Sequence, residues 1–193
     1  MRTMLIAMLG LMTAFGAAAQ ERLHRYVDAE TGVSFDYSAA WRPLDAAKDV
    51  HYLRPAIQPT RAAVVLDVSP AAYPGTDFAG LSFNYAIAPA ANAAACAAAI
   101  TMYGDAAVRP AVTINGRKFA AAEGGDAAMS HQMYERLYST FANNRCYVFD
   151  LALTTAGFGA ADNVRQMNEY EREDAQHALD VIFGTVRIAA TSK

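Results

Sequence analysis

The stretch TGVSFDYSAAW, residues 31–41, has a glycine turn, then an alternating segment, and ends with the only tryptophan in the chain. In a strand, Val33, Phe35 and Tyr37 face one side and the residues between them face the other. An indole at the exit of such a strand can close the open end of a hydrophobic core. We therefore expect Trp41 to be a core residue. The alternative is an exposed indole that stacks on a ligand.

Other strand-like segments lie on both sides of this stretch. Alternating or β-rich sequence predicts strands at residues 24–28, 33–38, 50–54, 62–68 and 81–87. Asn115-Gly116 and Asn143-Asn144 predict two further hairpins, because both residue types tolerate positive φ in tight turns. Strands that follow one another through short turns favour an antiparallel sheet.

The register of the second hairpin shows how its sheet is covered. A two-residue loop at Asn143-Asn144 places Phe141 opposite Cys146. One face then carries Leu137, Ser139, Phe141, Cys146 and Val148, and the other carries Tyr134, Tyr138, Tyr147, Phe149, Leu151 and Leu153. Both faces are largely apolar, so we expect the sheet to be covered on both sides.

Two segments have the spacing of helices. In residues 89–103, Cys96, Ile100 and Tyr103 recur on one helical face. Residues 161–188 predict a C-terminal helix that ends at Gly184, followed by a short strand. The apolar stripe of that helix consists of Ala175, Ala178, Leu179, Ile182 and Phe183.

Residues 1–19 have the features of an export signal. Arg2 precedes an uncharged apolar segment at residues 4–15, and alanines at positions 17–19 form a small-residue cleavage site. The apolar segment is shorter than the ~20 residues that span a bilayer. We expect cleavage after Ala19, a single domain over residues 20–193, and no stable membrane span afterwards. An uncleaved anchor is the alternative.

The two cysteines, Cys96 and Cys146, are interpreted in the light of export. An even number of cysteines in an oxidising compartment favours a disulfide. Cys96 lies on a predicted helix face and Cys146 at the start of a predicted strand. A helix packed on that strand would bring the sulfurs together. Two separate buried thiols are the alternative.

The sequence carries no recognisable catalytic, cofactor or metal motif. It lacks Gly-x-Ser-x-Gly, His-Glu-x-x-His, a phosphate loop and a dinucleotide fingerprint. We therefore expect no cofactor and no metal. The net charge of −3 comes without a basic run, which argues against nucleic-acid binding.

Two groups of residues are candidate sites. Glu123, Asp126, Ser130 and His131 would support a hydrolase, although neighbours on a strand such as Ser130 and His131 point to opposite faces. The second group is an aromatic face of Tyr134, Tyr138 and Tyr147, together with Arg136. It is either a binding face or core beneath a helix.

The segment GVSFDYSAAW resembles the opening pattern of the PsbP-like superfamily. Gly32, Phe35 and Trp41 match that pattern, and Ser38 stands where the family usually has proline. The resemblance implies an α/β/α sandwich of the α+β type, with a central, mainly antiparallel sheet and helices on both faces. It implies no catalytic residues, and the better-known members bind and stabilise larger assemblies.

Together these features predict an exported, non-enzymatic binding or assembly module of the bacterial cell envelope, periplasmic or secreted. Its expected partner is another protein or a small hydrophobic ligand. A secreted hydrolase that uses His131 with nearby acids is one alternative. A secreted inhibitor or immunity-type protein is the other, since a small disulfide-bonded chain permits it without indicating it.

Overall fold

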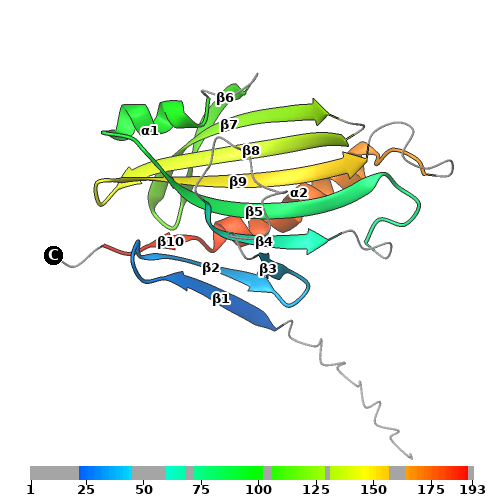
Figure 1. Ribbon diagram of the computed structural model, residues 1–193, viewed down its shortest axis with the longest axis horizontal. Helices are drawn as coiled ribbons and strands as arrows, with labels where there is room; N and C mark the ends of the chain where they lie inside the picture. Colours follow the sequence, from blue (N-terminus) through cyan, green and yellow to red (C-terminus); the bar gives the residue numbers. More distant parts are fainter. Residues whose placement is uncertain are drawn as a thin grey trace, which may run out of the picture.

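The computed structural model describes residues 22–44, 60–67, 72–101, 106–128, 131–156 and 164–190. These residues form an α+β fold that is mostly antiparallel sheet (Figure 1). The elements, in chain order, are β1 (Leu23–Asp28), β2 (Val33–Ser38), β3 (Arg42–Leu44), β4 (Thr60–Asp67), β5 (Phe78–Ala88), α1 (Ala93–Ala99), β6 (Ala107–Ile114), β7 (Arg117–Ala128), β8 (His131–Ala142), β9 (Arg145–Ala156), α2 (Glu169–Gly184) and β10 (Arg187–Ile188).

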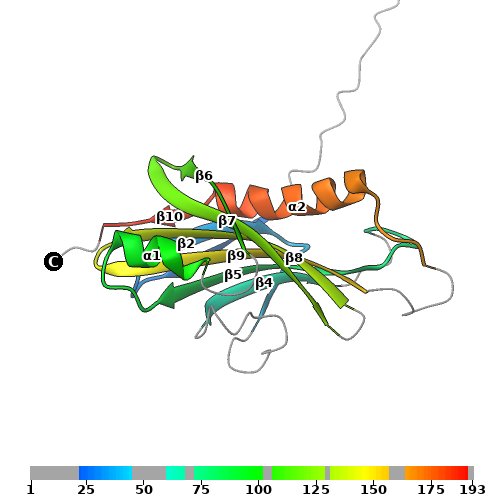
Figure 2. The same cartoon turned by 90° about the horizontal axis from the view of Figure 1, so that it is seen from above.

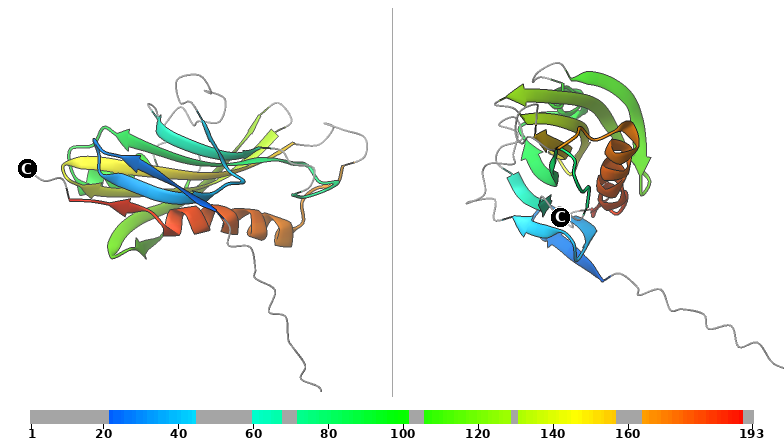
Figure 3. Two further views of the ribbon diagram at one scale, coloured as in Figure 1. Left: turned by 90° about the horizontal axis from the view of Figure 1, so that it is seen from below. Right: turned by 90° about the vertical axis from the view of Figure 1, so that its right-hand side faces the viewer.

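The strands are divided between two sheets. The large sheet has the order β3-β4-β5-β9-β8-β7-β6, and the small sheet has the order β1-β2-β10. Every strand pair in both sheets is antiparallel. The large sheet curves around α2, and the small sheet lies beside the helix at one edge (Figure 3).

The main core lies between the large sheet, α2 and the inner face of the small sheet. The helix buries Ala175, Leu179, Ile182 and Phe183, as its apolar stripe predicts. Phe183 stacks on Tyr138 of β8, with ring centroids 4.2 Å apart. Val33 and Phe35 of β2 and Trp41 are buried in the same core, which confirms the packing role expected for the indole.

A second, smaller core lies on the opposite face of the large sheet. Cys96 and Ile100 pack there on Leu137, Cys146 and Val148, and the Cys96–Cys146 disulfide confirms the expected pairing. Figure 2 shows α1 and α2 on opposite sides of the strands. However, α1 has only seven residues, so it does not form a full helical layer. The structure therefore has the expected α+β class. A complete α/β/α sandwich, with a helical layer on each face of the sheet, stays a prediction.

The local turn predictions are mostly confirmed. Asn115, Asn143 and Asn144 all have positive φ, and Phe141 pairs with Cys146 in the expected register. Gly184 is an exception, because the helix cap is Thr185 in a right-handed conformation that donates its N–H to Ile182. Helix α2 ends at Gly184 as predicted, but its C-cap is Thr185 and not Gly184.

Two predictions lie outside the described residues: the export signal at residues 1–19 and the strand at residues 50–54. Within the described part of the chain, no helix has the length and apolar character needed to cross a membrane.

A buried polar turn joins the two sheets. Thr31 is fully buried between β1 and β2, where its hydroxyl accepts a 2.7 Å hydrogen bond from Tyr85 of β5. Its carbonyl accepts a 3.0 Å bond from Tyr147 of β9. Asp28 accepts the Thr31 N–H at 3.3 Å and the Arg61 Nε–H at 2.6 Å. The turn is therefore bonded to three strands of the large sheet.

The disulfide should contribute substantially to stability. It joins residues 50 positions apart, and the chain-entropy model gives about 4 kcal/mol for a loop of this length. We expect the Cys96→Ala/Cys146→Ala variant to lose about this much free energy of unfolding in urea. Equal urea midpoints for the parent protein and the variant would contradict the prediction.

Asp28 should give a pH-dependent contribution. Burial raises its pKa, but hydrogen bonds from Arg61 and Thr31 outweigh burial and hold the pKa below the usual value. Its stabilisation is therefore complete above the unfolded-state pKa of ~3.9 and is lost as the pH falls further. We expect Asp28→Asn to lower the free energy of unfolding at pH 7 and to differ little from the parent near pH 2.

The matched control for this measurement is Asp126→Asn, because Asp126 is exposed at the far end of β7. This variant should unfold like the parent at both pH values. A loss for Asp28→Asn that is equal at pH 7 and pH 2 would mean that its charge is not the source of the stabilisation.

Candidate functional site

The aromatic face predicted as a binding surface is largely core. Tyr147 is fully buried, Tyr138 is 9% exposed, and Tyr134 is half-buried. Burial raises the pKa of Tyr138. Arg136 of the same face donates to Asp180 of α2 at 2.8 Å. Helix α2 therefore covers this face, and the face does not offer open aromatic area to a partner.

The acids and His131 proposed for a hydrolase form no hydrogen bond or ion pair with one another among the described side chains, although the register places Asp126 diagonally opposite His131 on one sheet face. Ser130 lies outside the described residues, and His131 is exposed at the start of β8. Glu123 pairs with Arg136 in the β7–β8 register, whereas Ala128 pairs with His131. Five positions along a strand correspond to ~16 Å. Glu123 is also bonded to Arg109 at 2.8 Å, so no acid–histidine pair forms among the described side chains.

Two further carboxylates, Glu135 and Asp150, are buried on the sheet face that carries α1. Both interact with other groups of the protein. In the described part of the chain, no group of three or more His, Cys, Asp or Glu side chains is arranged to hold a metal ion.

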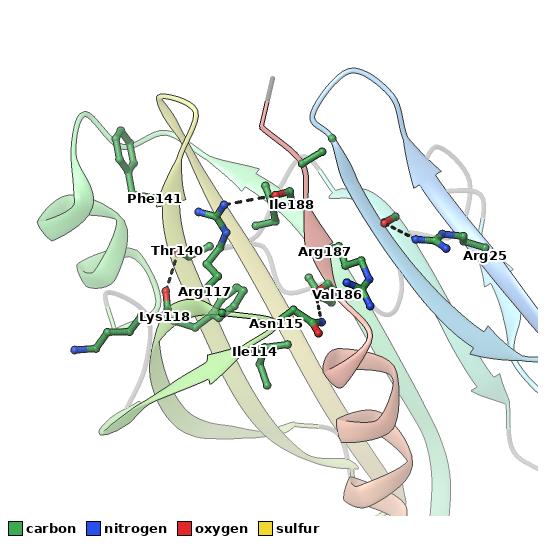
Figure 4. A pocket seen from close by; sticks show the side chains of 15 residues that line it. Arg25, Ile114, Asn115, Arg117, Lys118, Thr140, Phe141, Val186, Arg187 and Ile188 are labelled. Carbon is green, nitrogen blue, oxygen red and sulfur yellow. Dashed lines mark hydrogen bonds between the residues drawn. The ribbon is translucent and has the colours of Figure 1, made fainter. Parts of the chain in front are cut away.

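A groove of about 750 Å³ lies where the small sheet meets the β6–β7 and β8–β9 hairpins (Figure 4). The β6–β7 hairpin provides one wall, and β2 with residues 186–189 provides the other. Its apolar lining includes Ile114, Phe141 and Ile188, of which Phe141 and Ile188 are half-buried. It is therefore an amphipathic, open site at the junction of the two sheets.

Turn asparagines hold the two walls together. Asn115 donates its side-chain amide to the carbonyls of Gly184 at 3.0 Å and Val186 at 2.8 Å. Asn143 donates in the same way to Ala189 at 2.9 Å. Both residues have positive φ, which places their side chains beside the chain that follows α2. These bonds occupy carbonyls on both sides of the short edge strand β10.

Gly32 fixes the floor of the groove beside β10. Its φ is +77°, and a Cβ there would lie 3.1 Å from the carbonyl oxygen of Ala189. The Gly32 carbonyl accepts the Ala189 N–H at 3.0 Å. A side chain at position 32 would be strained by the backbone and would push the C-terminal segment away.

The groove is positively charged. Its described lining contains three arginines, Arg25, Arg117 and Arg187, and no carboxylate; Lys118 also belongs to the lining, but it follows Arg117 on β7 and its side chain points away from the arginines (Figure 4). Arg25 forms a long ion pair of 3.7 Å with Asp36, just outside the lining. Arg117 donates only a weak bond of 3.5 Å to the Ile188 carbonyl. Such a site can attract and hold an anion, because guanidinium groups match the planar geometry of oxyanions.

The sequence did not reveal these residues, since they come from three separate regions of the chain. The only local signal was Arg117-Lys118 immediately after the Asn115-Gly116 turn, which places two cations at the start of β7. Arg25 and Arg187 become neighbours of that turn only through the antiparallel pairing of β1 and β10 with β2.

Comparison with solved structures finds similar folds. PsbP (CyanoP) from Synechocystis sp. PCC 6803 matches with a TM-score of 0.47 and 15% identity over 93% of this chain and 100% of its own. LpqN, described as involved in cell envelope biogenesis of Mycobacterium tuberculosis, matches with a TM-score of 0.47 and 10% identity over 87% of this chain and 91% of its own. A Bacteroides thetaiotaomicron VPI-5482 protein has a TM-score of 0.45 and 10% identity, over 88% of this chain and 49% of its own.

At these identities the likeness concerns the fold alone. No protein-family model and no curated protein matches the chain.

The Asn115 side chain should stabilise the walls of the groove through its hydrogen bonds, in addition to any effect of its backbone conformation on the turn. Asn115→Gly keeps a residue that accepts positive φ but removes both side-chain bonds to the segment after α2. With a net contribution of about 1 kcal/mol per hydrogen bond, we expect a loss of about 1–2 kcal/mol in urea unfolding.

The control is Asn144→Gly, because Asn144 also has positive φ, is exposed and makes no side-chain hydrogen bond among the described residues. This variant should unfold like the parent. If both glycine variants lose the same stability, the effect comes from the turn backbone and not from the amide bonds.

Proposed function

We propose that this chain is an exported, non-enzymatic binding protein that holds an anionic ligand in the groove between the β6–β7 hairpin and β10. The observation that carries the proposal is the groove's charge: three arginines, Arg25, Arg117 and Arg187, and no carboxylate among its described lining residues. A neutral ligand would leave Arg117 and Arg187 without a counter-charge, so the groove favours an anionic ligand over the small hydrophobic ligand expected from the sequence.

Most described arginines outside the groove are paired with carboxylates; Arg172, which donates to the Met167 carbonyl, is an exception. Arg61, Arg109, Arg136, Arg145 and Arg165 each lie within 4 Å of a carboxylate. Arg117, Lys118 and Arg187 form no ion pair among the described residues, although the whole chain carries a net charge of −3. In a protein with an excess of acids, unpaired cations gathered in one groove favour a role in binding an outside anion.

The composition of the groove supports binding over catalysis. Its lining contains no His, Cys, Asp or Glu, the residues most used as nucleophiles and general acids or bases. Guanidinium groups keep their proton at all ordinary pH values, so they bind charge without transferring a proton. Ile114 and Ile188 add apolar contact for the uncharged part of a ligand.

The disulfide supports a location outside the cytoplasm. Structural disulfides persist in oxidising compartments and are rare in the reducing cytosol. The Cys96–Cys146 bond closes a 50-residue separation within the folded core, and the sequence carries an export-like segment at residues 1–19. Together these features support the envelope or the secreted fraction as the place where the groove meets its ligand.

The test is a titration with inorganic pyrophosphate, a simple polyvalent oxyanion, at low ionic strength. Proton–nitrogen NMR spectra should show saturable shifts at the amides of Gly116, Arg117, Arg187 and Ala189. A charge-assisted hydrogen bond contributes about 1.5–3 kcal/mol. Arg117→Gln and Arg187→Gln should therefore each weaken binding about tenfold or more, and added salt should weaken it further.

Arg109→Gln is the charge-matched control, because Arg109 is exposed on β6 and pairs with Glu123 outside the groove. It removes the same single charge and should leave pyrophosphate binding unchanged. The proposal fails if the groove amides do not respond, or if all three variants lose affinity equally, which would indicate a general charge effect.

A further inference from the structure

The outward face of the small sheet continues the groove onto an open surface. The pairing of β1, β2 and β10 places Arg25 opposite Asp36, and Ser34 between Val27 and Arg187. We call this surface the outer face; it consists of Leu23, Arg25, Val27, Ser34, Asp36, Ser38 and Arg187. Arg25, Ser34 and Arg187 also line the groove, so the two sites form one continuous surface.

Two apolar side chains protrude from this face. Leu23 is 64% exposed and Val27 is 62% exposed, and both flank Arg25 on β1. The inward residues Val33 and Phe35 are fully buried, so the small sheet already has its own core face. Packing in the fold therefore does not explain why Leu23 and Val27 are apolar.

The charges of the outer face are mainly positive. Arg25 donates to the Ser34 hydroxyl at 3.4 Å, and Arg187 lies opposite the same serine. Asp36 is the single carboxylate on this face and lies 3.7 Å from Arg25. Arg117 stands across the groove and adds one more cation at its rim (Figure 4).

We propose that the outer face docks on an anionic phospholipid surface, with lipid phosphates at the arginines and with Leu23 and Val27 inserted at the headgroup boundary. The inference rests on the proposed function, because it identifies the source of the anion that the groove binds.

The composition of the face matches a membrane better than a protein partner. Interfacial membrane binding combines cations with a few protruding apolar residues, and each Lys or Arg adds about fivefold to the affinity for an anionic surface. A stable protein interface needs about 800 Å² per partner with aromatic anchors in pockets. This face presents two aliphatic side chains among polar ones and no aromatic anchor among its described residues.

The experiment is co-sedimentation of the processed chain, checked by intact mass, with large vesicles. One set contains phosphatidylcholine alone and the other also contains phosphatidylglycerol. We expect binding only to the anionic set, and weaker binding as salt is added. Arg187→Gln should lower the partition coefficient about fivefold, Leu23→Ser/Val27→Ser should also lower it, and Arg109→Gln should leave it unchanged.

The pyrophosphate titration separates the two proposals. Retained pyrophosphate binding with no binding to anionic vesicles overturns the membrane inference and leaves the groove as a site for a soluble anion. If the protein binds neither pyrophosphate nor anionic vesicles, both the proposed function and the membrane inference are overturned. A further result would also overturn the inference: the Leu23→Ser/Val27→Ser variant binds vesicles like the parent, while Arg187→Gln does not. Lipid phosphates would then reach the groove without docking of the outer face. Thermal melts of each variant exclude loss of folding as the cause.

Discussion

The buried hydrogen bonds of Thr31 hold the two sheets in one fixed arrangement. The sheets share no backbone ladder, so their relation depends on side chains that cross between them. Burial raises the pKa of Tyr85, which keeps its hydroxyl protonated as the donor to Thr31. A buried hydroxyl or carbonyl without such a partner would cost about 1–3 kcal/mol. A shift of the small sheet would leave several of these groups unsatisfied at once, and this makes a single docking geometry strongly preferred.

The same turn determines where the groove lies. Gly32 follows Thr31 and approaches Ala189 closely, so the position of β10 depends on the turn. Asn115 and Asn143 then bond the segment after α2 from the other side. These amides bond carbonyls on both sides of β10, and Arg117 donates only a 3.5 Å bond to the Ile188 carbonyl. The groove therefore combines a backbone held by neutral amides with arginines, Arg117 and Arg187, that form no ion pair among the described residues.

Local sequence was sufficient for most of the described strands, the two asparagine hairpins and the disulfide, although it missed β3, and it failed where distant segments meet. Asn115-Gly116 and Asn143-Asn144 are turns by their own φ preferences, and the period-two register paired Phe141 with Cys146. The sequence could not tell whether the face of Tyr138 and Tyr147 is open, because its cover, α2, lies more than twenty residues further along. The groove was missed because its residues are also far apart in the sequence. Arg25 and Arg187 come close only because β1 and β10 both pair with β2.

The position of α2 explains how an acidic protein can present a positive groove. Glu169, Glu171, Glu173 and Asp174 lie in its first turns, whereas Gly184 at its end accepts a bond from Asn115 at the groove. At 1.5 Å per residue, the ten positions from Asp174 to Gly184 span ~15 Å, more than the ~8 Å Debye length at physiological salt. The acids therefore screen the groove only weakly. They also lie at the positive end of the helix dipole, and the groove cations lie at its negative end, so both groups are placed favourably. The resulting separation of charge would turn the groove, and not the acidic end of α2, towards a negatively charged ligand or surface.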